Sequence, residues 1–575
     1  MNSSHIAAGD PPGGLETRSS LRSSTAVDPA QFDRMFKNRL RLVGLAFLLM
    51  FFVIISRLLL LGILPRVENA VEPVSPSLAL KRPTIVDRNG EIVATDVPSQ
   101  SAFMDSRKLL DIDEAIELLR TVLPDINYGE LEERLSKRKG FVWVKRELSP
   151  EAARSIKDLG IPGLSFYSEN KRLYPGGNLA SHVIGLVDSD NRGIAGIEKY
   201  ADGLRSSKSS GPGQTPATQQ PIQLTLDMRV QFAVRDEISK AIEKFKAKGG
   251  AGLVMDVTSG EILALVSLPD FDPGVPSEAQ GEERINRINV GVYEMGSTFK
   301  ALTTAMALDS GRFTIDSLHD ARAPLVFGRF RIRDFQGKGR WLTTAEAFIY
   351  SSNISMARMA MSVGIEAHKA FLQKMGQFMR LKTELPESAQ PIIPTNWSEV
   401  TTATIAFGHG MAVAPLQAAM AVAGLVNGGT LIAPTFIKGT NVEQRVLGRD
   451  LVKPATSEAL RYLMRLNAEK GSAKNAAIDG YDVGGKTGSA EKVINGRYAE
   501  GRLLTSFMGV VPISQPKYLF LTMLDEPQAL PETSGYATSG WNAVPTTRTI
   551  MMRTLPLLGV QSNRLPGEAA TKTAN

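Results

Sequence analysis

The stretch GSTFKALTTAMALDSG, residues 296–311, begins with Gly and Ser, continues as an apolar helical pattern and ends in a second Gly. On a helix, residues three apart share a face, so the ammonium group of Lys300 can reach the hydroxyl of Ser297. A lysine held among apolar groups can lose its proton and act as the base that a serine nucleophile needs. Free backbone N–H groups at a helix start can also face a developing anion. The stretch therefore predicts a serine nucleophile at the start of an apolar helix.

The spacing Ser-x-x-Lys is weak evidence by itself, because it occurs five times, starting at Ser136, Ser168, Ser297, Ser489 and Ser514. A lone match is usually an ordinary exposed pair. The context favours Ser297, since a glycine precedes it and an apolar helix follows it. Ser136 lies instead in the charge run SKRKG, which is typical of a solvated face.

Two further motifs follow the predicted nucleophile. Residues 351–353 read Ser-Ser-Asn within a helical region, and residues 486–489 read Lys-Thr-Gly-Ser on a predicted strand. Lys486 and Gly488 should face one side of that strand and Thr487 the other. A cation and hydroxyls on an edge strand can hold a substrate carboxylate, and a small residue lets substrate lie close to the backbone. The order Ser-x-x-Lys, Ser-x-Asn, Lys-Thr-Gly is typical of penicillin-binding proteins and serine β-lactamases.

Two other Ser-x-Asn sequences occur in the chain, at 168–170 and 189–191. The second is a literal Ser-Asp-Asn. It precedes the predicted nucleophile and lies in a glycine-rich loop, so we interpret it as a turn.

Short apolar runs typical of strands lie at both ends of the C-terminal part, at 252–257, 262–267, 482–490, 504–511 and 518–525. Helical patterns lie among and after them, at 230–245, 342–379, 414–427 and 546–558. Strands at both ends with helices between them predict an α+β domain over residues 222–560, in which helices cover an antiparallel sheet.

Residues 42–64 read LVGLAFLLMFFVIISRLLLLGIL and carry one charge, Arg57. A helix of this length rises about 34 Å, enough to cross a hydrocarbon core of about 30 Å. Four basic residues lie within 27–41 and one within 65–79. The positive-inside rule therefore places the chain before the span in the cytoplasm and the chain after it outside. A cleaved signal peptide fits less well, because the run starts late, is long and lacks a small-x-small site. A buried core helix conflicts with the flanking charges.

The remaining segments differ in composition. Residues 1–41 form a predicted cytoplasmic, disordered tail, rich in Gly, Ser and Pro at its start. Residues 65–204 form a first exported domain, with predicted helices at 113–136 and 149–158 and an Asn-Gly hairpin at 88–90. Residues 205–221 contain no apolar residue larger than alanine and predict a linker or exposed loop. Residues 561–575 predict a polar tail.

The composition excludes several kinds of chemistry. The 575 residues contain no cysteine, which rules out disulfides, a thiolate nucleophile and cysteine-ligated metals. The five histidines are scattered, so neither a metal centre nor a cofactor is predicted. The net charge of +7 is modest for the length, and nucleic acid is not a predicted partner.

From the membrane span to about residue 558, the sequence resembles the class B penicillin-binding proteins. The three motifs carry this resemblance, together with RPTIVDRNG at 82–90, GIAGIE at 193–198, LTLD at 224–227, GHG at 408–410, PLQ at 415–417 and NGG at 427–429. The Ser-Ser-Asn form and the stretch ATSGWNAVP at 537–545 favour the septal, division-specific branch over the elongation branch. Met295 stands where proline is common, and Ser489 where threonine is usual but with the hydroxyl kept.

The resemblance implies a non-catalytic pedestal (dimerisation-like) domain over residues 65–204, a transpeptidase domain over 222–560 and a serine acyl-enzyme mechanism. Ser297 would attack the carbonyl between the terminal D-alanines of a stem peptide, and an amine of a neighbouring stem would then take the acyl group. Lys300 would be the base for Ser297. Ser351 and Lys486 would pass a proton to the leaving amine, and Asn353 would orient the substrate and the base.

The resemblance also implies how the substrate is held. Thr487, Gly488 and Ser489 would form the substrate-binding strand, with the two hydroxyls on the terminal carboxylate. The backbone N–H groups of Ser297 and Ser489 would form the oxyanion hole. β-Lactams would be trapped on Ser297.

The implied setting is the cytoplasmic (inner) membrane, with a single span and the catalytic domain in the periplasm or outside the cell. The implied partners are peptidoglycan stem peptides, the lipid-linked precursor polymer, a polytopic membrane glycosyltransferase of the division machinery and other divisome proteins. Three alternatives remain: an elongation-specific transpeptidase, a secreted β-lactamase and a membrane-anchored β-lactam sensor or inactive scaffold. A class A β-lactamase fits less well, because residues 353–486 contain no Glu-x-x-Leu-Asn.

Overall fold

The computed structural model describes residues 29–63, 81–208, 220–494 and 496–562, in two units, Met1–Leu78 and Ala79–Asn575. In the first unit, α1 (Pro29–Ile63) contains residues 42–63 of the predicted span, and its segment Arg41–Leu58 has a mean hydropathy of 2.1. Among the residues that the structure describes, α1 is the one helix that is both long enough and apolar enough to cross a membrane. It starts before the span because Pro29 suits a first helical turn and no glycine follows until Gly44. The rest of the predicted tail, residues 1–28, lies outside the described residues.

The N-terminal part of the second unit contains a sheet with strands in the order β3-β2-β1-β5, and β4 also pairs with β2. Its strands are β1 (Ile85–Val86), β2 (Ile92–Asp105), β3 (Phe141–Leu148), β4 (Leu164–Leu173) and β5 (Ile222–Gln223). The predicted Asn-Gly hairpin is confirmed by the antiparallel pairing of β1 with β2. Because β5 pairs with β1 in parallel, the start of the predicted second domain also completes this sheet. Of the predicted linker, residues 209–219 lie outside the described residues.

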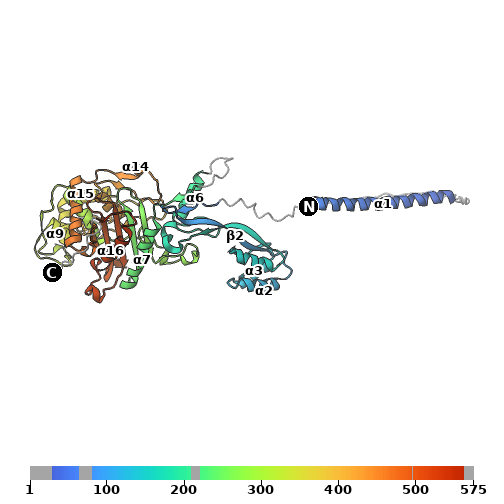
Figure 1. Cartoon of the computed structure of the whole chain (residues 1–575), viewed down its shortest axis with the longest axis horizontal. Helices are drawn as coiled ribbons and strands as arrows, with labels where there is room; N and C mark the ends of the chain where they lie inside the picture. The colour runs from blue at the N-terminus through green and yellow to red at the C-terminus, as the bar shows by residue number, and fades with distance from the viewer. Residues whose placement is uncertain (1–28, 64–80, 209–219, 495, 563–575) are drawn as a thin grey trace, which may run out of the picture. The chain divides into compact units, whose positions relative to one another are not determined.

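Three helices cover one face of this sheet: α2 (Ile112–Val122), α3 (Tyr128–Ser136) and α4 (Pro150–Asp158). Their apolar side chains pack with Ala102 and Met104 from the second half of β2, and Figure 1 shows α2 and α3 beside that strand. The helix predicted over 149–158 is confirmed. The helix predicted over 113–136 is instead two helices, because Pro124 interrupts it and Asn127 caps α3.

A buried ion cluster joins the first strands to α6 (Gly196–Lys208), which follows the short helix α5 (Ser181–Ile184). Glu198 binds Arg82 at 2.9 Å and Arg172 at 2.7 Å, and Arg172 also binds Asp96 at 3.0 Å. All four side chains are almost completely buried. Burial of the two guanidinium groups is tolerated only while their carboxylate partners remain.

The C-terminal part contains a five-stranded antiparallel sheet in the order β14-β15-β16-β6-β7. Its strands are β6 (Gly249–Asp256), β7 (Ile262–Leu268), β14 (Gly484–Ile494), β15 (Arg497–Val511) and β16 (Tyr518–Asp525). The pairing of β16 with β6 joins the end of the domain to its beginning. This confirms the predicted sheet of early and late strands.

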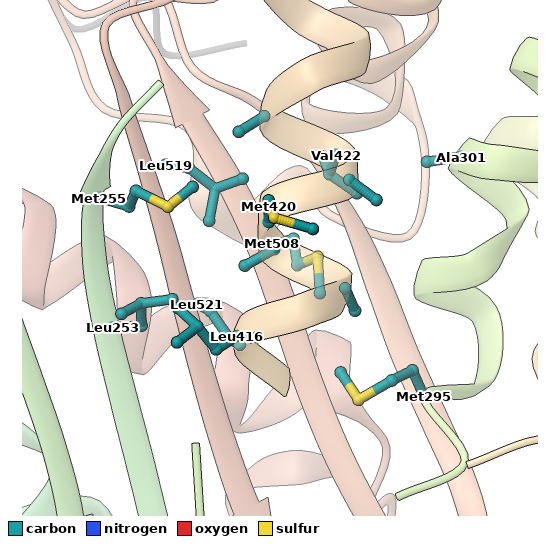
Figure 2. Packing of buried hydrophobic residues seen from close by; sticks show 14 of the residues in the cluster. Leu253, Met255, Met295, Ala301, Leu416, Met420, Val422, Met508, Leu519 and Leu521 are labelled. Atoms are coloured by element: carbon teal, nitrogen blue, oxygen red, sulfur yellow. The ribbon is translucent and has the colours of Figure 1, made fainter. Parts of the chain in front are cut away.

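Helices cover both faces of this sheet, and the alternation along β6 shows how. Leu253 and Met255 point into the larger core beneath α13 (Pro415–Val426), whereas Val254 points into a second core beneath α7 (Met228–Phe245) and α16 (Ala543–Thr554). Figure 2 shows α13 lying over the strands, with Leu416 and Met420 near the sheet. The sheet is therefore the middle layer of the domain.

The other elements lie between the two groups of strands. The helices are α8 (Lys300–Asp309), α9 (Thr344–Ile349), α10 (Asn353–Val363), α11 (Ile365–Lys374), α12 (Glu399–Ile405), α14 (Val442–Arg445) and α15 (Pro454–Lys470). The short strands are β8 (Leu318–Asp320), β9 (Leu325–Phe327), β10 (Phe330–Ile332), β11 (Trp341–Thr343), β12 (Leu431–Ile432) and β13 (Val446–Gly448). The helical region predicted over 342–379 thus comprises three helices.

The ion cluster of the N-terminal part makes a stability prediction. Glu198→Ala leaves two buried guanidinium groups without their shared carboxylate, so it should lower the free energy of unfolding of this part by about 3–5 kcal/mol. Glu133→Ala removes an exposed ion pair with Lys137 and should cost at most about 1 kcal/mol. Thermal unfolding of the two variants, compared with the wild type, measures the difference. If both variants lose equally little free energy of unfolding, the stabilising role of the ion cluster is contradicted.

Candidate active site

Ser297 lies in a single 3-10 turn (Gly296–Phe299) directly before α8. Gly296 has a φ of +52°, which glycine adopts without strain. Its N–H donates to the carbonyl oxygen of Gly408 over 3.1 Å, and a Cβ on Gly408 would lie 2.0 Å from the Gly296 oxygen. The backbones of residues 296 and 408 therefore touch beside the serine, and the first residue of the GHG stretch must be a glycine because a side chain there would clash.

The side chain of Lys300 is completely buried. Its Nζ lies 2.6 Å from the carbonyl oxygen of Ser351, 3.0 Å from Ser351 Oγ and 2.7 Å from Asn353 Oδ1. In the described part of the chain no hydrogen bond joins this Nζ to the Ser297 hydroxyl. The amine instead donates hydrogen bonds to three other oxygens.

Lys486, on β14, reaches the same hydroxyl from the other side. Its Nζ lies 3.1 Å from Ser351 Oγ, and its side chain is buried. Burial lowers the pKa of Lys486 to about 7. The pKa of Lys300 is held well below its usual range by burial and then by the positive charge of Lys486. The structure therefore brings Lys300, Ser351, Asn353 and Lys486 together, and burial favours neutral amines on both sides of one hydroxyl.

The position of Ser351 depends on a break between two helices. The chain leaves α9 after Ile349, Ser351 takes a φ of +57°, and α10 begins at Asn353. Ser352 caps the new helix by accepting the N–H of Ser355 over 3.1 Å. The Ser-Ser-Asn motif is thus a turn between helices, whereas the sequence pattern predicted a helical region without a break.

Asp334 holds this turn, and no sequence motif identified it. One carboxylate oxygen accepts from the Ser352 hydroxyl at 2.8 Å, and the other accepts from the Ile354 N–H at 3.0 Å. The preceding carbonyl, of Arg333, accepts from Asn353 Nδ2 at 3.0 Å. The negative charge of Asp334 also opposes the lowering of the pKa of Lys300. Asp334 therefore positions the motif and acts on the electrostatics of the base.

The Lys-Thr-Gly-Ser strand contributes differently at each position. The Thr487 and Ser472 hydroxyls lie 2.7 Å apart, and the Ser489 hydroxyl accepts the N–H of Ser539, in the stretch 537–545, over 3.1 Å. A Cβ on Gly488 would lie 2.5 Å from Ser506 Oγ and 2.9 Å from Thr298 Cγ2. Protein atoms fill this side of Gly488, so the glycine lets β14 pack against the serine turn rather than leaving space for substrate.

A second group of polar side chains borders the serine turn. Glu294 accepts the Gly410 N–H at 2.8 Å and the Tyr498 hydroxyl at 3.2 Å. Burial raises the pKa of Glu294 and lowers that of His409, which stacks on Tyr498, to about 4. These contacts tie the tip of the β14–β15 hairpin to the chain just before Ser297. Sequence reasoning found His409 and Gly410, which belong to the GHG stretch, but neither Glu294 nor Tyr498.

A serine at a helix start, three residues before one of two buried lysines that share a hydroxyl, and beside an edge strand of a helix-covered antiparallel sheet, defines a serine acyl-transfer site. Comparison with known proteins agrees with this class. Residues 250–551 match the penicillin binding protein transpeptidase domain, and residues 78–211 match the penicillin-binding protein dimerisation domain.

Several curated proteins are similar along most of the chain. A probable peptidoglycan D,D-transpeptidase FtsI of Caulobacter vibrioides is 37% identical over 84% of this chain and 82% of its own length. A probable peptidoglycan D,D-transpeptidase PenA of Neisseria meningitidis is 32% identical over 86% of this chain and 88% of its own. The stage V sporulation protein D of Bacillus subtilis is 29% identical over 84% of this chain and 79% of its own. The chain belongs to the class B penicillin-binding proteins, with a dimerisation domain followed by a transpeptidase domain.

The contacts of Asp334 make a prediction about rate. Asp334→Ala frees the Ser351 turn and should slow acylation by penicillin about 10- to 100-fold, as displacements of about 1 Å do in active sites. Asp320→Asn, which disturbs an exposed pair with Arg322, is the control and should change the rate less than about twofold. Second-order labelling rates measure both. An unchanged rate in Asp334→Ala would contradict the positioning role.

Asp334→Asn adds a prediction about pH. It keeps an oxygen acceptor for the turn but removes the negative charge that raises the pKa of Lys300. The pKa of Lys300 should fall further, so more of the amine is neutral in acid. The acidic limb of the acylation profile should therefore move to lower pH than in the wild type. A limb that moves to higher pH, or does not move, would contradict this electrostatic role.

Proposed function

We propose that Ser297 is the nucleophile with which this peptidoglycan D,D-transpeptidase forms its acyl-enzyme. The observation that carries the proposal is the Ser351 hydroxyl bound both by Lys486 and by Lys300, which lies three residues after Ser297. A serine hydroxyl needs a base to attack a carbonyl, and a leaving amine needs an acid. Two buried amines linked through one hydroxyl can supply both.

In the acylation step, Lys300 takes the proton of the Ser297 hydroxyl as Oγ attacks the carbonyl between the two terminal D-alanines. The oxygen that becomes negative is stabilised by the backbone N–H groups of Ser297 and Ser489, each worth about 3–4 kcal/mol by comparison with other acyl transferases. The peptide C–N bond then breaks, and the leaving D-alanine amine receives a proton from the Lys486–Ser351 pair. Lys300 then passes the proton that it took from Ser297 to this pair through Ser351, so the enzyme gains and loses no net proton in acylation.

In the transfer step, an amine of a neighbouring stem peptide attacks the ester carbonyl. A new amide bond forms, the bond from the carbonyl carbon to Ser297 Oγ breaks, and Oγ regains the proton that the amine loses. Asn353 orients the donor peptide and Lys300. Before the terminal D-alanine leaves, Thr487 and Ser489 bind its carboxylate, and Gly488 shapes that strand by its packing. β-Lactams acylate Ser297 in the same way and remain bound.

The positive-inside rule supports a cytoplasmic N-terminus and a periplasmic or extracellular catalytic domain on a single-pass protein of the cytoplasmic membrane. The likeness to the Caulobacter FtsI supports a role in septal cell-wall synthesis. The chain would then take stem peptides of a lipid-linked precursor polymer as substrates. A polytopic membrane glycosyltransferase and other division proteins would be its partners.

The nucleophile is tested by Ser297→Ala. The variant should lose penicillin labelling by a factor of about 10⁴ or more, while its thermal unfolding stays that of the wild type. Ser310→Ala, at the far end of α8, is a matched control and should label normally. Full labelling of Ser297→Ala would overturn the assignment. Rapid loss of the adduct from the wild type would favour a β-lactamase.

The orientation is tested by protease added outside an intact cytoplasmic membrane. Residues from 81 onward should be digested, and a tag placed before residue 29 should survive until the membrane is opened. A tag that is digested before the membrane is opened would reverse the proposed orientation.

A further inference from the structure

The segment from Ala321 to Trp341 is strongly basic. It contains one acidic residue, Asp334, and six basic ones: Arg322, Arg329, Arg331, Arg333, Lys338 and Arg340. Six basic residues and one acidic residue give this segment a net charge of +5. In the fold the segment comprises the β9–β10 hairpin and the loop that leads to β11.

Four of the six cations have no acidic partner within the described ranges. Arg322 pairs with Asp320 and Arg340 with Glu346, whereas the single acid of the segment is bound to the Ser351 turn. Arg329, Arg331, Arg333 and Lys338 are exposed, and none forms an ion pair with any residue that the structure describes. These four cations are therefore able to bind an anion.

The hairpin geometry groups three of these charges. Arg329, Arg331 and Arg333 alternate along β10 and its ends, so they share one face of the strand. The other face of β10 is fixed by Ile332, which packs with Ala357 and Phe407. Like charges on one strand face repel each other, and an anionic ligand would relieve that repulsion.

Apolar rings are exposed among these cations. Phe330 is 56% exposed, Phe335 77% and Trp341 46%. Arg322 lies over Trp341, and Lys338 lies 4.8 Å from the ring centre of Tyr350, the residue before Ser351. Exposed apolar rings amid polar neighbours are typical of an interaction surface. We call residues 329–341 the basic-aromatic surface.

This surface borders the Ser351–Asn353 edge of the active site. The carbonyl of Arg333 binds Asn353, and the next residue, Asp334, binds Ser352. In the proposed mechanism, Thr487 and Ser489 on β14 bind the donor's terminal carboxylate until it leaves with the released D-alanine. Transfer then requires a second stem peptide to approach Ser297 while the acyl part of the first is attached to it, so the acceptor amine must reach the ester from a side that the bound acyl chain leaves open.

We propose that the basic-aromatic surface binds the acyl acceptor, an acidic stem peptide of a neighbouring peptidoglycan strand, through its carboxylates. This inference rests on the proposed function. A stem peptide carries several carboxylates, and exposed arginines pair with carboxylates in two-point contacts. Binding of the acceptor there concentrates its amine near the acyl-enzyme and favours transfer over hydrolysis.

The test uses the full chain in neutral detergent, a thioester donor peptide and two acceptor peptides that differ only in amidation of their carboxylates. The variant Arg329→Gln/Arg331→Gln/Lys338→Gln removes three charges of the surface. The control, Lys139→Gln/Arg154→Gln/Lys157→Gln, removes three exposed charges of the N-terminal part. None of the control residues forms an ion pair within the described ranges.

With the carboxylate acceptor at low salt, the surface variant should lose about 10-fold in the rate of transfer relative to hydrolysis, the effect of a few exposed charge pairs. With the amidated acceptor it should equal the wild type, and the control should equal the wild type with both. Penicillin labelling of Ser297 should stay within about twofold. Equal losses with both acceptors, or no loss with either, would overturn the inference.

Penicillin labelling distinguishes a failure of the proposed function from a failure of acceptor binding alone. If the wild type is not labelled at Ser297, the proposed function fails and acceptor binding fails with it. If labelling is normal but acceptor use is unchanged in the surface variant, only acceptor binding fails.

A second arm of the test distinguishes the acceptor from membrane lipid as the anion. The transfer assay is repeated in phosphatidylcholine vesicles with and without phosphatidylglycerol. The surface variant should differ from the wild type in both kinds of vesicle. A variant that differs only when phosphatidylglycerol is present would show that the surface binds lipid phosphate, which overturns acceptor binding.

Discussion

The hydroxyl of Ser351 between two buried lysines is the interaction on which the chemistry of this domain depends. Lys300 and Lys486 both contact it, so their Nζ atoms are no farther apart than the sum of two hydrogen bonds. Burial lowers the pKa of both amines, and the positive charge of Lys486 lowers the pKa of Lys300 further. Burial and this repulsion therefore both favour a neutral Lys300. A serine nucleophile needs a base, and a neutral lysine can act as one. The burial that disfavours charged amines in this site therefore also provides the base for Ser297.

The rest of the domain holds these three groups in place. Lys486 is fixed because β14 pairs with β15 in antiparallel register along this part of the strand. Lys300 is fixed by α8, whose buried residues belong to the same core as those of α13. Ser351 is held by a left-handed backbone conformation and by Asp334, and not by regular secondary structure. The group at the centre of the site is therefore held by the least regular part of the fold, which is why its anchoring carboxylate matters.

The sequence was sufficient to predict the residue types of the site and an antiparallel sheet built from early and late strands. Three motifs at separate places in the chain favour one class of site, and apolar strand patterns at both ends of the domain predict the sheet. It was not sufficient to predict Asp334, because a single acid in a basic loop has no periodicity or spacing to mark it. Helix geometry predicted that Lys300 can reach Ser297, but spacing could not show that Ser351 and Asn353 accept its hydrogen bonds in the described part of the chain. Gly488 was assigned to substrate access, whereas neighbouring protein atoms occupy the space that a Cβ would need. These differences all concern contacts between segments distant in the sequence.

The loop that carries Asp334 links the electrostatics of the base to the surface beside it. Asp334 faces inward to the Ser351 turn, while Arg331 and Arg333 on either side of Ile332 are exposed. A single short segment thus provides the one acidic charge that acts on Lys300 and the basic charges that face solvent. Because the inward acid is engaged in hydrogen bonds with the turn, it does not pair with the outward cations. Ile332, which lies between Arg331 and Arg333, packs in an apolar cluster with Ala357 and Phe407 and so fixes which way the neighbouring arginines face. An anion bound to the outer face would therefore reach the active-site edge without displacing the carboxylate that positions Ser351.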